Sequence, residues 1–484
     1  MEVSKMNQNQ NDKTLGVLPL AMFAVGTTLA SGVFSLSGDF AAGGAHTLAT
    51  LIGWAICGIG MFGLTMCFFK LSIVKKDLTS GIYTYARSGF GEYIGFNAAW
   101  GYWMSAILAQ LAFITLFFET LGHYAVAFGN GTNLASCALA SVIIWALSLL
   151  VLRGVNQAVV VNVVIVIAKI VPILSVVVAI MLGGAFSWDI FTQNFAGTGE
   201  MSLLEQVKST VYVTVWIFIG IEGAVVISGR GRTTKISGQA TIISFTSLFL
   251  LYFLISFLSM GVLPAEELAA LANPSLGGVL EYVVGPWGAT LVHIALLISV
   301  GGAMFSYTIL CVDSAFGPAA YGAFPEVLSR KNKLGAPTWS VIASALIVQL
   351  FIVIIYFNDA TFQMCYALST SAIMVPYVFS AFYYFKIVYR GEDREIEKGS
   401  RVAPWIIAII GAFYGVWLLY ASGLTYILAM TILYAPGTIM YLYHRQKTGQ
   451  RYFDKASDMA ICAILVALAV LALILTVKGT IVWF

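Results

Sequence analysis

The sequence has very little charge. Of its 484 residues only 10% are Asp, Glu, Lys or Arg, whereas 60% are hydrophobic. A water-soluble domain carries about 25% charged residues, because its surface must be solvated. A soluble globule is therefore excluded, and the mean hydropathy of +0.91 indicates a chain built for lipid. Since no segment is long or polar enough to form a second domain, we expect one polytopic membrane domain.

Residues that carry redox, metal or catalytic chemistry are also scarce. The six cysteines stand singly in apolar runs without a CxxC spacing, and the four histidines are scattered. This pattern favours neither a disulfide framework nor a metal site. The net charge of +3 is not concentrated in one cluster, which argues against a nucleic-acid partner. We find no paired acid and base, nucleophile motif or phosphate loop, so we predict a protein that is not an enzyme and uses no cofactor.

Long apolar runs, by contrast, recur along nearly the whole chain. Residues 1–14 are polar and lead into an apolar run without a small-residue cleavage pattern, so we interpret them as a cytoplasmic tail. Apolar windows of membrane-spanning length then predict thirteen spans. They lie near 15–38, 47–69, 93–121, 134–152, 156–183, 206–228, 238–263, 287–311, 337–356, 362–385, 402–421, 425–443 and 457–477.

The cations predict the orientation in the membrane. With a cytoplasmic N-terminus, 22 of the 25 Lys and Arg residues fall in inside segments, as the positive-inside rule requires. We therefore expect a multi-pass protein of the cell membrane. An odd number of spans would place the C-terminal Phe484 outside.

Two spans are interrupted by glycines at their centres. The first contains the stretch from Gly26 to Phe34, and the sixth contains the stretch from Trp216 to Ala224. Close helix contact is one explanation for such glycines. Breaks in corresponding positions five spans apart instead favour two inverted five-helix repeats with a binding site between them. A broken helix offers N–H groups for a carboxylate and carbonyls for an ammonium, which together suit an amino acid.

Two ionisable residues lie inside apolar spans. Lys169 has no acid within one helical turn, so its ammonium must face carbonyls or a cavity. Glu222 follows Trp216 by six residues and could bind a cation, carry a proton, close a gate or form a structural ion pair. Trp216 lies one turn before the break, where its ring could cover a ligand.

Several motifs together resemble the amino acid-polyamine-organocation (APC) superfamily, and within it the basic amino acid/polyamine antiporters. The resemblance covers residues from about 15 to 443. It is carried by ASGVF from Ala30, LTSGIYTYARSGFGEYIGF from Leu78, AWGYW from Ala99, AKIVPI from Ala168, WIFIGIEGA from Trp216, FPEVLSRKNKLGAPT from Phe324 and VPY from Val375.

The resemblance implies an all-α, LeuT-like fold that works by alternating access. We expect a first five-helix repeat over 15–185, an inverted second repeat over 206–386 and accessory helices over 402–484. Amino acids or amines and the lipid bilayer are the expected partners, and a homodimer is a possible assembly.

The family motifs also imply individual site residues. The substrate-binding positions are Ala30, Ser31, Gly32, Ser105, Gln110, Trp216, Ile219, Tyr307 and Ser369. Glu222 corresponds to the glutamate of an inner gate, with Tyr102 and Tyr377 as its partners. Lys169 matches a lysine whose ammonium replaces a sodium ion in members that lack sodium coupling. No metal site is implied.

The resemblance favours an antiporter that exchanges arginine or another cationic amino acid for a related amino acid or amine. Tyr307 stands where the arginine/agmatine type has tryptophan, and this departure leaves the substrate open. A histidine/histamine-type or other amino acid/decarboxylated-amine exchanger is the alternative within this class. A proton-coupled uptake permease would use the same fold, and a sensor on this fold would not need a complete gate. A channel would need a selectivity-filter pattern, which we do not find.

Overall fold

The computed structural model describes residues 16–78, 82–154, 159–222, 234–394 and 399–479. Within these ranges the regular elements are helices, and no β-strand is formed beyond one isolated bridge between Lys331 and Pro337. The tail over 1–14, the motif residues Gly223 and Ala224, and Phe484 lie outside the described residues. The expected all-α membrane fold is confirmed in this part of the chain.

Most predicted spans correspond to single helices. These are α3 (Thr47–Val74), α5 (Glu92–Gly122), α6 (Leu134–Leu152), α7 (Val159–Leu182), α11 (Thr234–Met260), α14 (Pro286–Ala320), α15 (Thr338–Asn358), α16 (Phe362–Arg390) and α18 (Ala456–Val477). Helix α14 continues beyond its predicted end at 311. Pro318 does not stop it there, since a proline in the last turn removes only one backbone donor.

Short helices occupy the connections. They are α4 (Ile82–Phe90), α8 (Trp188–Thr192), α12 (Ala265–Ala270) and α13 (Ser275–Val284).

Local sequence signals set several helix starts. Ser202 and Glu205 form a reciprocal capping box at the start of α9 (Leu203–Trp216). The Asn133 side chain accepts a hydrogen bond from the Ser136 amide at the start of α6. Pro286 occupies the first turn of α14, where its missing N–H costs no helical hydrogen bond.

The first span is broken as predicted. Helix α1 (Val17–Thr28) and helix α2 (Gly32–Ala42) are separated by Leu29, Ala30 and Ser31. The sixth span is broken too, because α9 ends at Trp216 and a non-helical turn follows over 217–221. Gly220 has a φ of +101° in this turn, a conformation that glycine adopts without steric cost.

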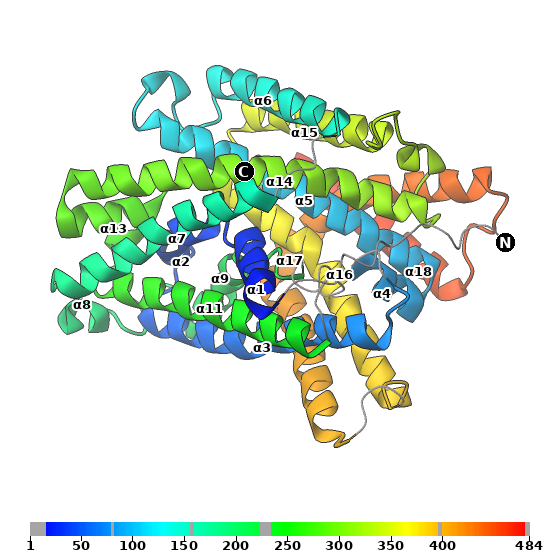
Figure 1. Cartoon of the computed structure of the whole chain (residues 1–484), viewed down its shortest axis with the longest axis horizontal. Coiled ribbons are helices and arrows are strands. Elements are labelled where there is room, and N and C mark those ends of the chain that lie inside the picture. Colours follow the sequence, from blue (N-terminus) through cyan, green and yellow to red (C-terminus); the bar gives the residue numbers. More distant parts are fainter. Residues whose placement is uncertain (1–15, 79–81, 155–158, 223–233, 395–398, 480–484) are drawn as a thin grey trace.

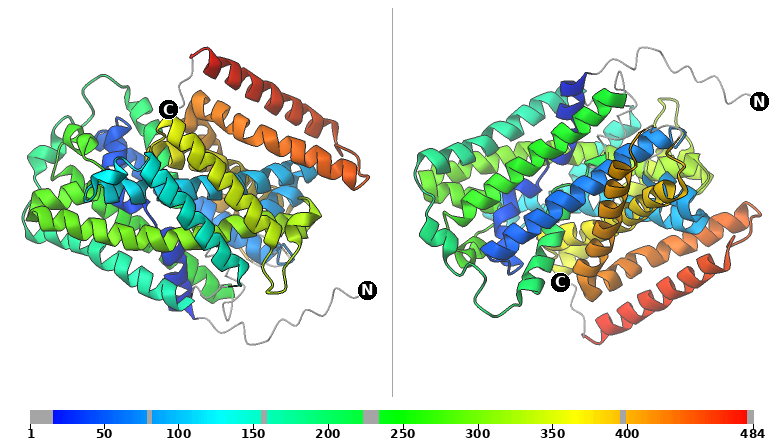
Figure 2. Two further views of the ribbon diagram at one scale, coloured as in Figure 1. Left: turned by 90° about the horizontal axis from the view of Figure 1, so that it is seen from above. Right: turned by 90° about the horizontal axis from the view of Figure 1, so that it is seen from below.

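The spans predicted over 402–421 and 425–443 join directly, without a loop. Both lie in α17 (Val402–Lys447), whose backbone leaves the helical conformation only at Gly423, with φ of 72° and ψ of 164°. The two halves of α17 point in different directions in Figure 2. A single glycine suffices for this bend, because it can adopt a positive φ.

Nine helices in the described part of the chain are long and apolar enough to cross a membrane. The total of thirteen spans stays a prediction. In the apolar 18-residue windows of α5 and α16, 83% and 78% of the residues are buried, whereas in that of α18 the share is 11%. Helices α5 and α16 therefore form the centre of the protein, and α18 lies at its edge (Figure 2).

The remaining helices surround this centre. Helices α6 and α15 lie side by side along one face, and α1 packs against α11 (Figure 1). Helix α17 packs closely on α3, where Gly60 faces the ring of Tyr414 and Gly63 faces Ile410. A side chain at either glycine would overlap these residues, so small residues set the close helix approach.

Candidate functional site

The break between α1 and α2 frees backbone carbonyls, and two buried side chains bind them. The Lys169 Nζ atom on α7 donates a hydrogen bond to the Leu29 carbonyl at 2.8 Å. The Ser299 hydroxyl on α14 donates to the Ala30 carbonyl at 2.9 Å. Groups from α7 and α14 thus hold the break. Because no acid lies within one helical turn of Lys169, the sequence predicts that its ammonium faces carbonyls or a cavity, and it does face a carbonyl.

The start of α2 presents polar groups that no protein atom satisfies. Ser31 is fully buried, and its hydroxyl has no hydrogen-bond partner. Gly32 begins α2 directly beside the sixth-span break, since an added Cβ would lie 2.9 Å from Trp216 Cδ1 and 2.7 Å from Ile217 Cγ2. Glycine is therefore required here, and it brings the two broken spans into contact.

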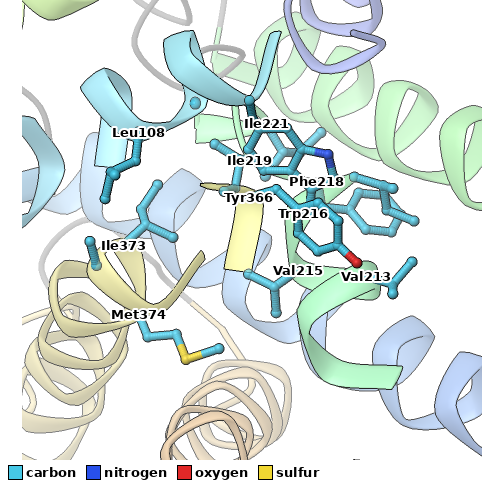
Figure 3. Packing of buried hydrophobic residues seen from close by; sticks show 14 of the residues in the cluster. Leu108, Val213, Val215, Trp216, Phe218, Ile219, Ile221, Tyr366, Ile373 and Met374 are labelled. Atoms are coloured by element: carbon cyan, nitrogen blue, oxygen red, sulfur yellow. The ribbon is translucent and has the colours of Figure 1, made fainter. Parts of the chain in front are cut away.

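Trp216 joins this break to a group of aromatic rings. Its ring stacks on Tyr366 at a centroid distance of 5.6 Å and an interplanar angle of 25°. Phe362 lies edge-on at 6.3 Å, and Phe113 lies at 5.7 Å. The Trp216 Nε1 atom is buried without a partner. Figure 3 shows Trp216, Ile219 and Tyr366 close together within the buried cluster.

The aromatic group extends to the predicted side-chain pocket. Phe113 meets Tyr307 of α14 at 4.8 Å with an interplanar angle of 87°. The Gln110 amide donates to Thr308 at 3.2 Å, while its Oε1 atom has no partner. Gln110 and Tyr307 therefore lie on facing helices, and one buried acceptor remains available there.

Ser105 and Ser369 bind each other. Their hydroxyl oxygens are 3.1 Å apart, and the Ser369 hydroxyl donates to the Ser105 carbonyl at 2.8 Å. Both side chains are buried between α5 and α16. The structure brings this predicted pair together, but their hydrogen bonds tie the two helices instead of leaving free groups.

Glu222 binds both of its predicted tyrosine partners. The Tyr102 hydroxyl donates to Oε1 at 3.1 Å, and the Tyr377 hydroxyl donates to Oε2 at 2.6 Å. The Gly220 amide also donates to Oε2 at 3.1 Å. Glu222 is only 2% exposed, so these three donors compensate the burial of its carboxyl group. The cluster connects the sixth-span break to α5 and α16.

Sequence reasoning missed Phe113, Phe362 and Tyr366. Phe362 and Tyr366 are four residues apart on α16, so helical spacing places them on one face. This face also holds Ser369, which was predicted, and that spacing was the available signal. Phe113 lies one turn after Gln110 on α5 and carries a similar signal.

Comparison with known proteins identifies the family of this chain. The family model for amino acid permeases matches residues 15–441. The arginine/ornithine antiporter of Pseudomonas aeruginosa is 39% identical, over 96% of this chain and 98% of that protein. The L-lysine transport protein of Corynebacterium glutamicum is 36% identical, over 97% and 96% of the two chains.

A third relative is the arginine/agmatine antiporter of Chlamydia abortus, which is 34% identical over 96% of this chain and 97% of that protein. The match of the family model and the length of these alignments confirm the resemblance seen in the sequence motifs. The chain therefore belongs to the amino acid permease family of the APC superfamily, and it is a multi-pass membrane transporter of amino acids.

Proposed function

We propose that the protein is an antiporter of the cell membrane that exchanges a cationic amino acid, with arginine favoured, for a related amino acid or amine. The observation that carries this proposal is the contact between Gly32 and Trp216. It places the indole ring of Trp216 directly beside the start of α2. One small molecule with a carboxylate at one end and a cation at the other can meet both groups.

The start of α2 suits the α-carboxylate. Amides at a helix start lack the usual partner four residues back, and the helix dipole favours negative charge there. In α2 the Phe34 amide donates to the Ser31 carbonyl at 3.0 Å. The unpartnered Ser31 hydroxyl adds a donor between the small residues Ala30 and Gly32. Carbonyls of the turn over 217–221, which includes Ile219, suit the α-ammonium.

The remaining groups suit a cationic side chain. Trp216 offers a π face, and the Gln110 Oε1 atom is an unpartnered acceptor. Tyr307 closes the pocket through Phe113, and the bonded pair Ser105 and Ser369 borders it. An imidazole or an aromatic side chain could also stack on Trp216, so a histidine/histamine-type exchanger is the second candidate.

Transport requires that access alternate between the two sides. In the proposed mechanism, Glu222 with Tyr102 and Tyr377 forms the closed inner gate, and Trp216 with its aromatic neighbours covers the outer side. Lys169 supplies the positive charge that a coupling sodium ion would otherwise bring to the break. The two repeats over 15–185 and 206–386 would move relative to each other, with 402–484 as accessory helices. A homodimer stays a prediction.

Counterflow in liposomes tests the proposal. Purified protein is reconstituted in liposomes that contain ornithine, lysine, agmatine, histamine or buffer alone, and uptake of labelled arginine is measured. An antiporter takes up arginine only when a suitable internal amino acid or amine is present. Uptake into buffer-loaded liposomes that follows an imposed proton gradient would contradict exchange and support a proton-coupled permease. The internal compounds that drive uptake identify the exchanged pair.

A further inference from the structure

One face of α2 carries three buried polar side chains that extend outward from the proposed site. Ser31, Ser35 and Asp39 are spaced by four residues, so they lie on the same face of the helix. Their exposed fractions are 0%, 0% and 4%. Each has a side-chain oxygen without a hydrogen-bond partner, namely Ser31 Oγ, Ser35 Oγ and Asp39 Oδ2. Eight residues of helix place Asp39 about 12 Å beyond Ser31.

Helix α16 carries a second row of polar side chains, which starts beside Asp39. The Gln363 amide donates to Asp39 Oδ1 at 3.2 Å, which connects the outer end of α2 to the first turn of α16. Thr370 follows Gln363 by seven residues on the same face, and its buried hydroxyl also has no partner. Between them lies Tyr366, which stacks on Trp216. The two stripes therefore begin at Asp39 and Gln363 and approach the broken helix.

The carboxyl group at the outer end of these stripes has one oxygen, Asp39 Oδ2, without a hydrogen-bond partner. No ion pair joins Asp39 to a cation within the described ranges. A buried carboxyl group with one unsatisfied oxygen is costly, so a structural role alone does not account for it. A ligand ammonium or guanidinium would donate to this oxygen, and its positive charge would stabilise the ionised form of Asp39.

On the basis of the proposed cationic substrate, we infer that Asp39 is an outer binding station for the side chain of the incoming amino acid. The ammonium or guanidinium binds Asp39 Oδ2 first, while Gln363 holds Oδ1. The substrate then moves along Ser35 and Thr370, whose hydroxyls replace part of its hydration shell. It arrives at Ser31 with its cation at Trp216. Asp39 thus selects for positive charge before the substrate reaches the central site, where most of the groups are neutral.

The test compares Asp39→Asn with wild type for arginine and for citrulline, a neutral analogue of almost the same shape. The amide oxygen of the introduced asparagine can still accept from Gln363, so the contact between α2 and α16 is retained. External arginine is varied in uptake assays with a saturating internal exchange partner, and citrulline is used as a competitor. We expect the KM for arginine to rise about tenfold, because a charge-assisted hydrogen bond is lost. The inhibition constant for citrulline should not change, and Asp39→Glu should restore much of the arginine affinity.

Two controls separate this inference from its alternatives. Asp189→Asn removes an exposed carboxylate from α8 and tests whether general surface charge matters, so its KM should equal that of wild type. An unchanged melting temperature of Asp39→Asn in detergent would show that the fold persists. If the KM for arginine is unchanged, or if arginine and citrulline weaken equally, Asp39 is not a station for the cation. If wild-type protein exchanges no cationic amino acid at all, the proposed function fails instead.

Discussion

At the level of single residues, Trp216 connects three elements of the proposed site. Its ring lies against Gly32 of α2, Phe113 of α5 and Tyr366 of α16. The stack with Tyr366 leaves Trp216 only 5% exposed. A substrate that binds the stacked face of Trp216 must therefore displace Tyr366. The position of the Tyr366 ring thus controls access of the substrate to Trp216.

Replacement of Trp216 tests its role as a ligand-binding group. Trp216→Leu keeps an apolar side chain but removes the π face, so arginine binding should weaken by roughly tenfold, in line with about 1 to 2 kcal/mol for a desolvated cation–π contact. Isothermal titration calorimetry measures this affinity. Trp339→Leu is the control, because Trp339 is 51% exposed and remote from the aromatic group in sequence. Equal arginine affinity in Trp216→Leu and wild type would refute the assignment.

In our proposal Glu222 closes the inner gate through its hydrogen bonds with Tyr102 and Tyr377. A substitution that weakens these bonds should therefore affect the rate of exchange. Glu222→Gln retains the shape but removes the negative charge that strengthens the bonds from Tyr102 and Tyr377. We expect the turnover of exchange to fall by about tenfold or its pH dependence to weaken, while equilibrium arginine affinity changes less than about threefold.

Calorimetry and liposome exchange on the same Glu222→Gln protein distinguish these effects. Glu281→Gln serves as a matched control, since Glu281 is an exposed acid of α13. A large loss of affinity with unaltered turnover would assign Glu222 to substrate binding instead of the gate.

At the level of helices, the broken first span depends on α7. The Lys169 ammonium crosses between the two elements to reach the Leu29 carbonyl at 2.8 Å. This contact joins the predicted fifth span to the first. In our proposal, the Lys169 ammonium holds the break in place of a bound sodium ion, and this role stays a prediction.

Sodium dependence and Lys169→Ala test this connection together. Wild-type exchange should be the same in sodium and in choline buffer. Lys169→Ala leaves the buried Leu29 carbonyl without its partner, a cost of about 1–3 kcal/mol, so exchange should fall although Lys169 does not touch the substrate. Lys235→Ala removes an exposed lysine and should have no effect. A strict sodium requirement in wild type would contradict the role of Lys169.

For the molecule as a whole, the positive-inside pattern predicts which loops face the cytoplasm. The six native cysteines are all buried, so we expect them to react little with a maleimide reagent. In this background, Glu200→Cys should react with a membrane-impermeant maleimide on intact cells. Lys333→Cys should react only after permeabilisation, because three predicted spans separate the two positions. Both positions are exposed in the structure. Labelling of Lys333→Cys on intact cells would overturn the predicted orientation.

The order of amino acids was sufficient to predict the class of protein and the places where its helices break. Low charge and repeated apolar runs suffice for a polytopic helical protein, because the bilayer admits few other structures. The sixth-span break is a local event, since Gly220 adopts a backbone angle that other residues avoid. The joint at Gly423 also has a local signal, because a glycine stands between the two predicted spans and no polar loop separates them.

Which side chains meet became known only from the packing of the folded chain. Glu222 is 120 residues from Tyr102 and 155 from Tyr377, and the three come together only when α5 and α16 pack beside the sixth-span break. Sequence resemblance suggested this set, but neither it nor helical periodicity identified Tyr366 or Asp39. Helices buried on nearly all sides have no polar face to reveal which side points to the site. The direction of each side chain is therefore set by the packing of distant helices, which a local pattern does not contain.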